Sequence, residues 1–426
     1  MPGMNTSVLA STPPHNILEP GLEHSVIWHA IGLPIVFILA SYFAGGGWIV
    51  WKVNLLSVWV GLTLFCYVVT AWINHNMLRF PMAKGSRIIL ANASLAFMIV
   101  LTVLTFGGFN FSRRFLLVTY FLTFTWQWLG FFLLENAKPH LAIMQGEMTN
   151  KLLKLRAVEW EILALPAKPV TASGVVVDTN IVREPEWIRF FTDCALRGMP
   201  VYDAGSVYEM MTGRAFLNHD ATNLAEQCTP PSLYLAIKQM VEFVMVTVSL
   251  PVLLPLIGLI ALLIRLDSPG PAFFWQERVG KSGKTFCMVK FRTMSINDEH
   301  GTPRFAIAED HRITRLGRWL RRFRLDELPQ IWNVLRGEMS LIGPRPEQVP
   351  FACLFAREIP LYPCRQLVKP GITGWAQVNQ GYASGQEETR TKLGYDLYYV
   401  KRCSFWLDAL IALRTVRTVV TGHGAR

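Results

Sequence analysis

Four uninterrupted apolar runs occupy the first third of the 426-residue chain and limit the folds that it can adopt. Each run holds about 19–20 residues, which is the length that an α-helix rising ~1.5 Å per residue needs to cross ~30 Å of hydrocarbon. The runs are apolar around the whole helical circumference, which favours lipid over the core of a soluble bundle. We therefore predict four membrane-spanning helices, at Val26–Ala44, Leu55–Ile73, Ile88–Gly107 and Phe115–Leu134.

Positive charge is concentrated in the carboxyl-terminal half of the chain. Residues 232–426 contain 26 Lys and Arg against 16 Asp and Glu, so this half carries +10 of the formal net charge of +11. The loop between the second and third apolar runs is also basic, with Arg79, Lys84 and Arg87. Because basic residues accumulate on the cytoplasmic side of membrane proteins, we expect both termini there. The seven cysteines are scattered and include no CxxC pair, which agrees with a reducing compartment.

Residues 138–215 have the pattern of a small α/β domain. Strands are predicted at 140–144, 174–178 and 199–203, with an amphipathic helix at 184–198 and a short helical stretch ending near Leu155. Alternating strands and helices predict parallel pairing. The turn after the first strand offers Gly146 alone, whereas a dinucleotide site needs a glycine-rich turn. We interpret this domain as Rossmann-like and degenerate, without a working cofactor site.

A fifth apolar run covers Phe243–Ile264. It contains Pro251, Pro255 and Gly258, and a proline inside a helix removes a hydrogen bond and produces a kink. Spanning the membrane here would also move the basic half of the chain to the outside. We predict a re-entrant helix over about 238–264 that breaks at Pro251 or Pro255 and enters one leaflet only. A kinked helix that spans the membrane is the alternative.

The segment "RFRLDELPQIWNVLRG" places an acidic pair, Asp326-Glu327, directly after a row of arginines at positions 312, 315, 318, 321, 322 and 324. Local sequence favours Asp326 as the N-cap of the following helix, with Pro329 in the first turn and Gly337 at the end. A helix N-terminus is also an anion site, and an ionised carboxylate there can bind Mg²⁺ or attack a phosphorus atom. Both interpretations of Asp326 stay open on this evidence.

Other basic and amide side chains lie in loops suited to anion binding. Arg345 stands between two prolines that restrict its backbone, and arginine binds phosphate oxygens in a bidentate manner. A hairpin predicted over 276–294 delivers Lys290 and Arg292 from its second strand. The Gly- and Pro-containing loop "VKPGITGWAQVNQ" offers groups that can hold a sugar or nucleobase, namely Lys369, Trp375, Gln377 and Asn379.

Together these motifs resemble the bacterial sugar transferases, the polyprenyl-phosphate hexose-1-phosphate (phosphoglycosyl) transferases. The resemblance covers about 195 residues from Ser232 onwards. It rests on "DSPGPAFFWQERVG", "KFRTM", "RITRLGRWLRRFRLDELPQIWNVLRGEMSLIGPRPE", "KPGITGWAQVN" and "YDLYYVK". Four preceding helices and a Rossmann-like domain are similar to the large-architecture branch of that family.

The resemblance implies transfer of a sugar 1-phosphate from a UDP-sugar to undecaprenyl phosphate, with release of UMP, as the first membrane step of exopolysaccharide, capsule or O-antigen synthesis. It implies an aspartyl phosphosugar intermediate on Asp326, with Mg²⁺ held by Asp326 and Glu327. The substrate-binding residues that it implies are Lys290, Arg292, Arg318, Arg345, Lys369, Gln377, Asn379 and Asp396. It further implies contact with inner-membrane lipid and no nucleic acid, and is compatible with a homodimer.

The predicted fold class is therefore membrane α plus α/β. The chain is divided into an N-terminal tail, a four-helix transmembrane domain, a degenerate Rossmann-like domain, a linker and a membrane-associated α/β catalytic domain, at 1–22, 23–137, 138–215, 216–232 and 233–426. Three other functions remain open: a phosphatase, although the sequence lacks DxDx[TV]; a direct glycosyltransferase; and a membrane scaffold in which Asp326 is only a cap.

Overall fold

The computed structural model describes residues 22–45, 58–81, 83, 85–109, 111–134, 139–146, 148–155, 158–166, 172–178, 184–217, 229–294, 313–380 and 386–421. The predicted tail lies outside these residues apart from Leu22, and so does most of the predicted linker. The chain divides into two compact units, Met1–Gly213 and Arg214–Arg426.

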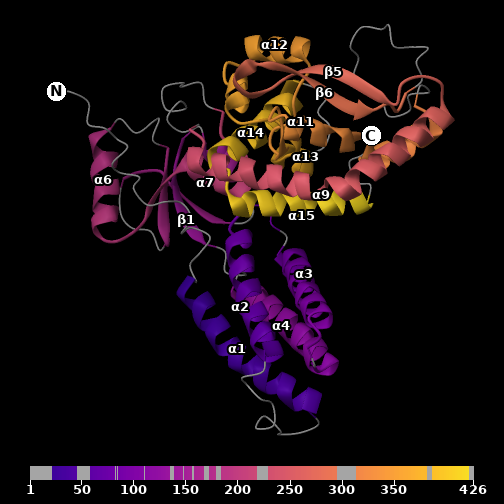
Figure 1. The fold of residues 1–426 in the computed structure, drawn as a ribbon. Helices are drawn as coiled ribbons and strands as arrows, with labels where there is room; N and C mark the ends of the chain where they lie inside the picture. The colour runs from indigo at the N-terminus through magenta and orange to yellow at the C-terminus, as the bar shows by residue number, and fades with distance from the viewer. Residues whose placement is uncertain are drawn as a thin grey trace. The chain divides into compact units, whose positions relative to one another are not determined.

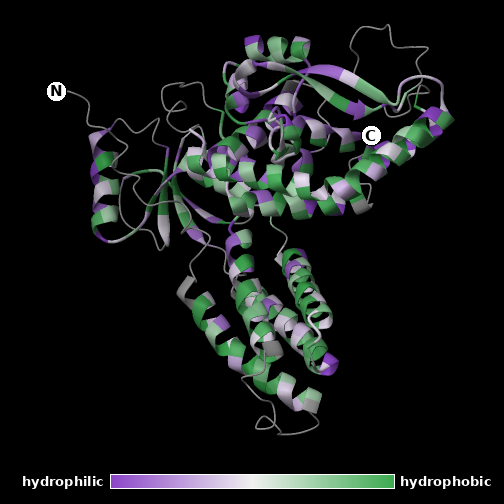
Figure 2. Ribbon diagram, viewed as in Figure 1, coloured by the Kyte–Doolittle hydropathy of each residue, from purple (hydrophilic) through white to green (hydrophobic). Residues whose placement is uncertain are grey.

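The first unit begins with four long helices, α1 (Leu22–Gly45), α2 (Val58–Leu78), α3 (Gly85–Phe106) and α4 (Arg113–Leu134). Buried polar side chains connect three of them. Asn92 on α3 donates a hydrogen bond to Asn74 on α2 over 2.7 Å, and Asn74 donates to Gln127 on α4 over 2.7 Å. Polar side chains that pair across helices stabilise helix association in lipid. Apolar residues make up most of these four helices, with polar residues between them (Figure 2).

Four of the described helices are long and apolar enough to span a membrane. Three of them, α1, α3 and α4, match the predicted first, third and fourth spans. The fourth is α9 (Ser232–Asp267), while α2 is not among them. The predicted second span covers Leu55–Ile73, but residues 55–57 lie outside the described residues and α2 continues into the polar residues Asn74, His75 and Asn76.

A parallel four-stranded sheet completes the first unit, with strand order β2-β1-β3-β4. Its strands are β1 (His140–Met144), β2 (Glu159–Leu163), β3 (Gly174–Val177) and β4 (Val201–Asp203). The helices are α5 (Thr149–Leu152), α6 (Pro185–Leu196) and α7 (Ala204–Thr212). The parallel pairing is confirmed, and β2 was not predicted. Asp203 caps α7 by accepting a hydrogen bond from the Ser206 amide, and Gly213 ends it in the left-handed conformation.

The second unit contains an antiparallel hairpin and a short parallel pair of strands. The hairpin joins β5 (Phe273–Val279) to β6 (Thr285–Phe291) through the 3₁₀ turn η4 (Lys281–Gly283), as predicted. The strands β7 (Ser340–Ile342) and β8 (Gly371–Thr373) pair in parallel. The remaining elements are α10 (Arg315–Arg322), η6 (Leu325–Gln330), α11 (Ile331–Leu335), α12 (Val349–Glu358), η7 (Tyr362–Leu367), α13 (Trp375–Asn379), α14 (Gln386–Arg402) and α15 (Phe405–Thr421).

The apolar helix α9 stays helical through Pro251 and Pro255, so the predicted break does not occur. The helix changes direction along its length (Figure 1). A kink is the ordinary result of a proline in a long helix, because only one hydrogen bond per proline is lost.

One face of α9 packs on its own domain along most of its length. Val246 joins a core with the hairpin and α11, and Ile260 and Ile264 join a second core with β6 and α10. Nearer its start, Lys238 forms a buried ion pair with Asp408 of α15 over 2.8 Å. The helix is therefore part of the domain fold, and its other faces expose large apolar side chains.

Candidate active site

The acidic pair lies in the 3₁₀ turn η6, between α10 and α11. Arg324 precedes this turn with a left-handed backbone (φ 53°), a conformation that is uncommon for a non-glycine residue and concentrates at functional sites. Asp326 is the second residue of the turn, and the cap position belongs to Arg324, whose side chain forms no capping hydrogen bond. The N-cap interpretation of Asp326 is therefore wrong, because a 3₁₀ turn precedes α11 and starts before the acidic pair.

Glu327 is buried and paired with Arg345, which comes from the loop after β7. Arg345 Nη2 donates to Glu327 Oε1 over 2.8 Å. Burial alone would raise the pKa of Glu327, but Arg345 and Lys290 outweigh it and lower that pKa well below its usual range. Glu327 is thus a fixed negative charge at neutral pH.

Asp326 has the opposite shift. Burial and the neighbouring charge of Glu327 raise the pKa of Asp326 to about 6, although Lys290, Arg345 and Arg321 act against them. The Asp326 carboxyl is still mostly ionised at pH 7, but it takes up a proton at a higher pH than the Glu327 carboxyl does. Adjacent carboxyls with diverging pKa values are typical of catalytic sites.

Two more cations act on this pair. Burial, Arg345 and Arg278 lower the pKa of Lys290, at the end of β6, to about 8, and the two carboxylates only partly offset this. Arg321 on α10 is held in place by a hydrogen bond from its Nε to Thr293 Oγ1 over 2.9 Å. Of the predicted phosphate ligands, Lys290 and Arg345 thus act on the acidic pair, and Arg321 joins them. Nothing in the arginine row distinguishes Arg321 from its neighbours before the fold is known.

Two other predicted phosphate ligands, Arg318 and Arg292, lie in different surroundings from Lys290 and Arg345. Arg318 is exposed on α10. Arg292 is buried, and its guanidinium donates to the carbonyl oxygens of Pro269 and Ser268, each over 2.8 Å. Arg292 therefore fastens the end of β6 to the turn that follows α9, and a phosphate would have to displace these bonds.

The predicted nucleotide-sugar loop is engaged within the domain. Asn379 Nδ2 donates to the Trp375 carbonyl over 2.8 Å, and its Oδ1 accepts a hydrogen bond from Arg414 of α15. Gln377 Nε2 donates to the Ile372 carbonyl over 3.2 Å. Lys369 has its pKa lowered by burial and by Lys281 at the hairpin turn. The charged neighbour that most affects Lys369 is Lys281. The charges that act most strongly on Asp326 belong to other residues, so Lys369 is not among the main charges around the acidic pair.

Asp396 is buried on α14 and binds Arg365, with Oδ2 2.7 Å from Nη2. Arg365 in turn donates to the backbone carbonyl of Arg345 over 2.8 Å. Asp396 is thus connected to the acidic pair through two arginines. Sequence reasoning missed Arg365, because a lone arginine in "YPCRQL" carries no local signal of burial.

The site offers two carboxylates to a metal ion. Among the residues that the structure describes, no group of three or more His, Cys, Asp or Glu side chains is placed to hold one. Mg²⁺ is commonly bound through one or two carboxylates, with water and substrate phosphates completing its coordination. Asp326 and Glu327 therefore fit a Mg²⁺ that binds together with a diphosphate substrate.

The region that contains this site matches a protein-family model described as bacterial sugar transferase, over residues 233–422. A UDP-N-acetylgalactosamine-undecaprenyl-phosphate N-acetylgalactosaminephosphotransferase of Aeromonas hydrophila is 37% identical over 391 residues, covering 89% of this chain and 91% of that protein. The chain belongs to the bacterial sugar transferase family, as the sequence motifs predict.

Other relatives match a smaller share of this chain. A UDP-glucose:undecaprenyl-phosphate glucose-1-phosphate transferase of Xanthomonas campestris pv. campestris is 45% identical over 191 residues, which cover 44% of this chain and 39% of that protein. A protein of the same description from Caulobacter vibrioides is 40% identical over 191 residues, covering 44% of this chain and 71% of that protein. Similarity to the Aeromonas protein covers about twice as much of this chain, and a match of 391 residues is longer than the second unit, so it extends into the first.

Proposed function

We propose that the protein transfers a sugar 1-phosphate from a UDP-sugar to undecaprenyl phosphate, releasing UMP and forming undecaprenyl-diphosphate-sugar. The product would begin the synthesis of an exopolysaccharide, capsule or O-antigen. The observation that carries the proposal is the acidic pair itself. Asp326 has a raised pKa beside an ionised Glu327, with Arg345, Lys290 and Arg321 around them, in the region that matches the family model.

The transfer proceeds in two displacements on one phosphorus atom. A carboxylate oxygen of Asp326 attacks the sugar-bearing phosphorus of the UDP-sugar and forms a P–O bond, while the bond to the UMP oxygen breaks. A phosphate oxygen of undecaprenyl phosphate then attacks the same phosphorus, and the Asp326 carboxylate leaves. Cations near both steps stabilise the charge that develops on the phosphoryl oxygens.

The carboxylates of Asp326 and Glu327 would hold Mg²⁺ together with the diphosphate. The ion supplies neutralisation of the diphosphate charge. Glu327 is well suited to this because it stays ionised, and Arg345 orients it through the 2.8 Å hydrogen bond. Asp326 lies within the field of three cations, Lys290, Arg345 and Arg321.

We further propose that α9 enters one leaflet of the bacterial inner membrane and leaves the catalytic domain on the cytoplasmic face. Lys238 and Ile264 are 26 residues apart, or about 39 Å along a helix, which exceeds the ~30 Å of hydrocarbon. Both residues nevertheless pack on the same domain. If α9 spanned the bilayer, the polar domain would have to lie in lipid beside it.

We also propose that the protein forms a homodimer. Light scattering of the detergent-solubilised protein tests this.

UDP-N-acetylgalactosamine is the first sugar donor to test. Similarity to the Aeromonas transferase covers 89% of this chain, whereas similarity to the Xanthomonas glucose-1-phosphate transferase covers 44%. UDP-glucose and UDP-galactose form the rest of the panel.

The deciding experiment measures UMP release by the purified protein reconstituted into membranes, with Mg²⁺, undecaprenyl phosphate and each UDP-sugar. Wild type, Asp326→Asn and a matched control, Glu387→Gln, are compared. Glu387 is an exposed acid in the first turn of α14. We expect UMP with one donor from wild type and the control, and a loss of at least about 100-fold in Asp326→Asn.

A second arm omits the lipid acceptor. The covalent route predicts a burst of up to one UMP per active site, because the first displacement needs only the sugar donor. A direct glycosyltransferase would release UDP instead of UMP, and a scaffold would release neither. UMP from Asp326→Asn at the wild-type rate would assign the nucleophile to another residue.

A further inference from the structure

The loop that carries Arg345 is fixed by hydrogen bonds to four consecutive backbone carbonyls, at residues 344–347. The backbone amides of Gly371 and Val279 bond the carbonyls of Pro344 and Glu347, each over 3.0 Å. The other two donors are side chains. Arg365 Nη2 binds the carbonyl of Arg345 over 2.8 Å, and Arg278 Nη1 binds that of Pro346 over 3.1 Å. Because the loop's two prolines have no N–H group, its carbonyl oxygens are the main backbone groups through which hydrogen bonds can fix the loop.

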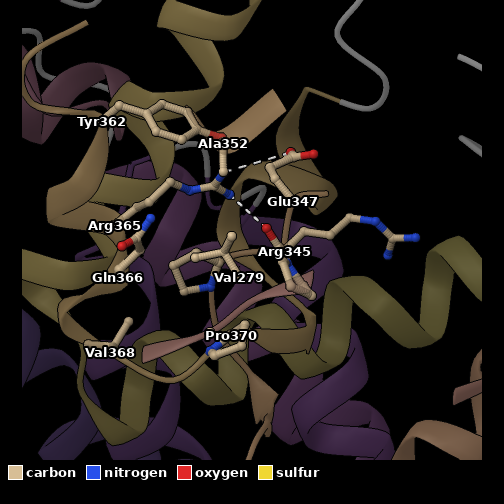
Figure 3. A pocket seen from close by; sticks show the side chains of 12 residues that line it. Val279, Arg345, Glu347, Ala352, Tyr362, Arg365, Gln366, Val368 and Pro370 are labelled. Atoms are coloured by element: carbon tan, nitrogen blue, oxygen red, sulfur yellow. Dashed lines mark hydrogen bonds and ion pairs between the residues drawn. The ribbon is translucent and has the colours of Figure 1, made fainter. Parts of the chain in front are cut away.

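Arg365 is itself held on several sides. Its guanidinium lies 2.7 Å from Asp396, donates to the Tyr362 hydroxyl over 2.6 Å and lies 3.7 Å from Glu347. The side chain of Arg365 is 6% exposed and that of Asp396 is 2% exposed. Figure 3 shows the Arg365 guanidinium directed at Glu347 and at the backbone of Arg345, while the Arg345 side chain extends away from the pocket.

Arg365 lines a pocket together with Glu347 and Val368. Its side chain is almost fully buried, and its guanidinium contacts Asp396, Tyr362, Glu347 and the Arg345 carbonyl. A sugar nucleotide would have to displace these partners to bind Arg365 directly. A role for Arg365 in the reaction must therefore pass through the residues that it holds.

We propose that Arg365 and Asp396 are positioning residues for the transfer reaction, and this proposal rests on the function proposed above. Asp396 orients Arg365, and Arg365 fixes the carbonyl of Arg345. With its backbone fixed, the Arg345 side chain reaches Glu327 at 2.8 Å beside the nucleophile. Asp396 lies 51 residues from Arg345 in sequence and connects to it through this single buried arginine.

The test is a double-mutant cycle on the rate of UMP release. Arg365→Lys keeps the charge and loses the planar fork of donors. Displacing a reacting group by about 1 Å can cost ~100-fold in rate. We therefore expect kcat to fall roughly 10- to 100-fold, with little change in the KM for undecaprenyl phosphate. The matched control is Arg357→Lys, an exposed arginine on α12, which should keep the wild-type kcat.

Coupling to Arg345 separates positioning from a general structural effect. If Arg365 acts through Arg345, Arg345→Ala combined with Arg365→Lys is no slower than Arg345→Ala alone. If the fold-loss in kcat of the double variant equals the product of the losses in the two single variants, the proposal is overturned. If Arg365→Lys does not fold, Tyr362→Phe replaces it in the cycle, because it removes one hydrogen bond to Arg365 and keeps the ion pair.

An arm that does not depend on turnover separates this proposal from the proposed function. Amide hydrogen exchange across residues 343–348 should be faster in Arg365→Lys and unchanged in Arg357→Lys. Equal exchange in Arg365→Lys and wild type overturns the positioning role, even where UMP release is confirmed. Faster exchange in a protein that releases no UMP would support the loop contact and refute the reaction.

Discussion

Arg345 donates a hydrogen bond to Glu327 over 2.8 Å, and this contact contributes to the opposite pKa shifts of the two neighbouring carboxyls, Glu327 and Asp326. It stabilises the charge of Glu327 and lowers the pKa of that carboxyl. The Glu327 charge then acts on Asp326 and helps to raise its pKa to about 6. An arginine that binds one carboxylate thus helps to determine how readily the other ionises.

The first prediction concerns the pH dependence of the reaction. Asp326 attacks as a carboxylate, so wild-type kcat/KM, which reports the free enzyme, should fall as the pH drops through about 6. In Glu327→Gln the charge that raises the pKa of Asp326 is absent, and the fall should move to lower pH. The same variant should lose roughly 100-fold in kcat at pH 8. A pH–rate profile of UMP release for both proteins measures this. A fall at unchanged or higher pH would contradict the assignment of Asp326.

The second prediction concerns stability in acid. Burial tends to raise the pKa of Glu347, but Lys392 and Arg365 outweigh it and lower the pKa to about 2. A carboxyl with a lowered folded-state pKa stabilises the protein above its unfolded pKa, near 4.5, and loses this contribution as pH falls towards 2. The contribution is on the order of 3 kcal/mol.

Thermal unfolding of the detergent-solubilised chain between pH 2.5 and 7 tests it. Wild type should lose stability over this window, and Glu347→Gln should start lower at pH 7 and lose less. Parallel curves for the two proteins would show that Glu347 contributes nothing to the acid sensitivity.

The third prediction concerns the close approach of β7 and β8. A Cβ atom at Gly371 would lie 2.1 Å from the amide nitrogen of Gly343 and 2.6 Å from the carbonyl oxygen of Thr373. Both contacts are to backbone, which cannot move aside without breaking the pairing. Gly371→Ala should therefore lower the free energy of unfolding by about 2–4 kcal/mol.

A matched alanine substitution is available in α9. Apart from the backbone of its own helix, a Cβ at Gly258 would meet no atom within 4 Å, so Gly258→Ala should be neutral or stabilising by about 0.5–1 kcal/mol. Chemical or thermal unfolding of the two variants compares them directly. Equal effects would mean that the β7–β8 contact is looser than the structure has it.

The fourth prediction concerns the placement of α9 in the membrane. Leu233 and Leu266, near its two ends, are each 75% exposed. Single cysteines at these positions in a cysteine-free protein should react with a membrane-impermeant maleimide from the same side of sealed vesicles. Labelling from opposite sides would establish a spanning helix and refute the proposed single-leaflet entry.

Local patterns in the sequence predict much of this fold. The β5–β6 hairpin, the parallel strands and three of the spans follow from hydrophobic periodicity and turn residues. Periodicity could not show that α9 stays helical through two prolines, because that depends on the domain packed against it.

The site was predicted less completely. Its acidic pair and the Lys290 and Arg345 cations follow from spacing and from the family resemblance. The partners of Arg365 are Asp396, 31 positions away, and the Arg345 carbonyl, 20 positions away, and no local pattern joins them. Arg292 was assigned to phosphate because a basic residue after a strand looks the same whether its partners are ligands or carbonyls.

The packing of α9 on its own domain has a consequence for synthesis at the ribosome. The helix leaves the ribosome before its partners, since its cores are completed by Phe291, Leu320 and Val334, which come later in the chain. Until then its inward face has no protein to cover it, and that face is apolar from Val246 to Ile264. This face of the nascent helix therefore needs another apolar cover until the hairpin and α11 have folded against it.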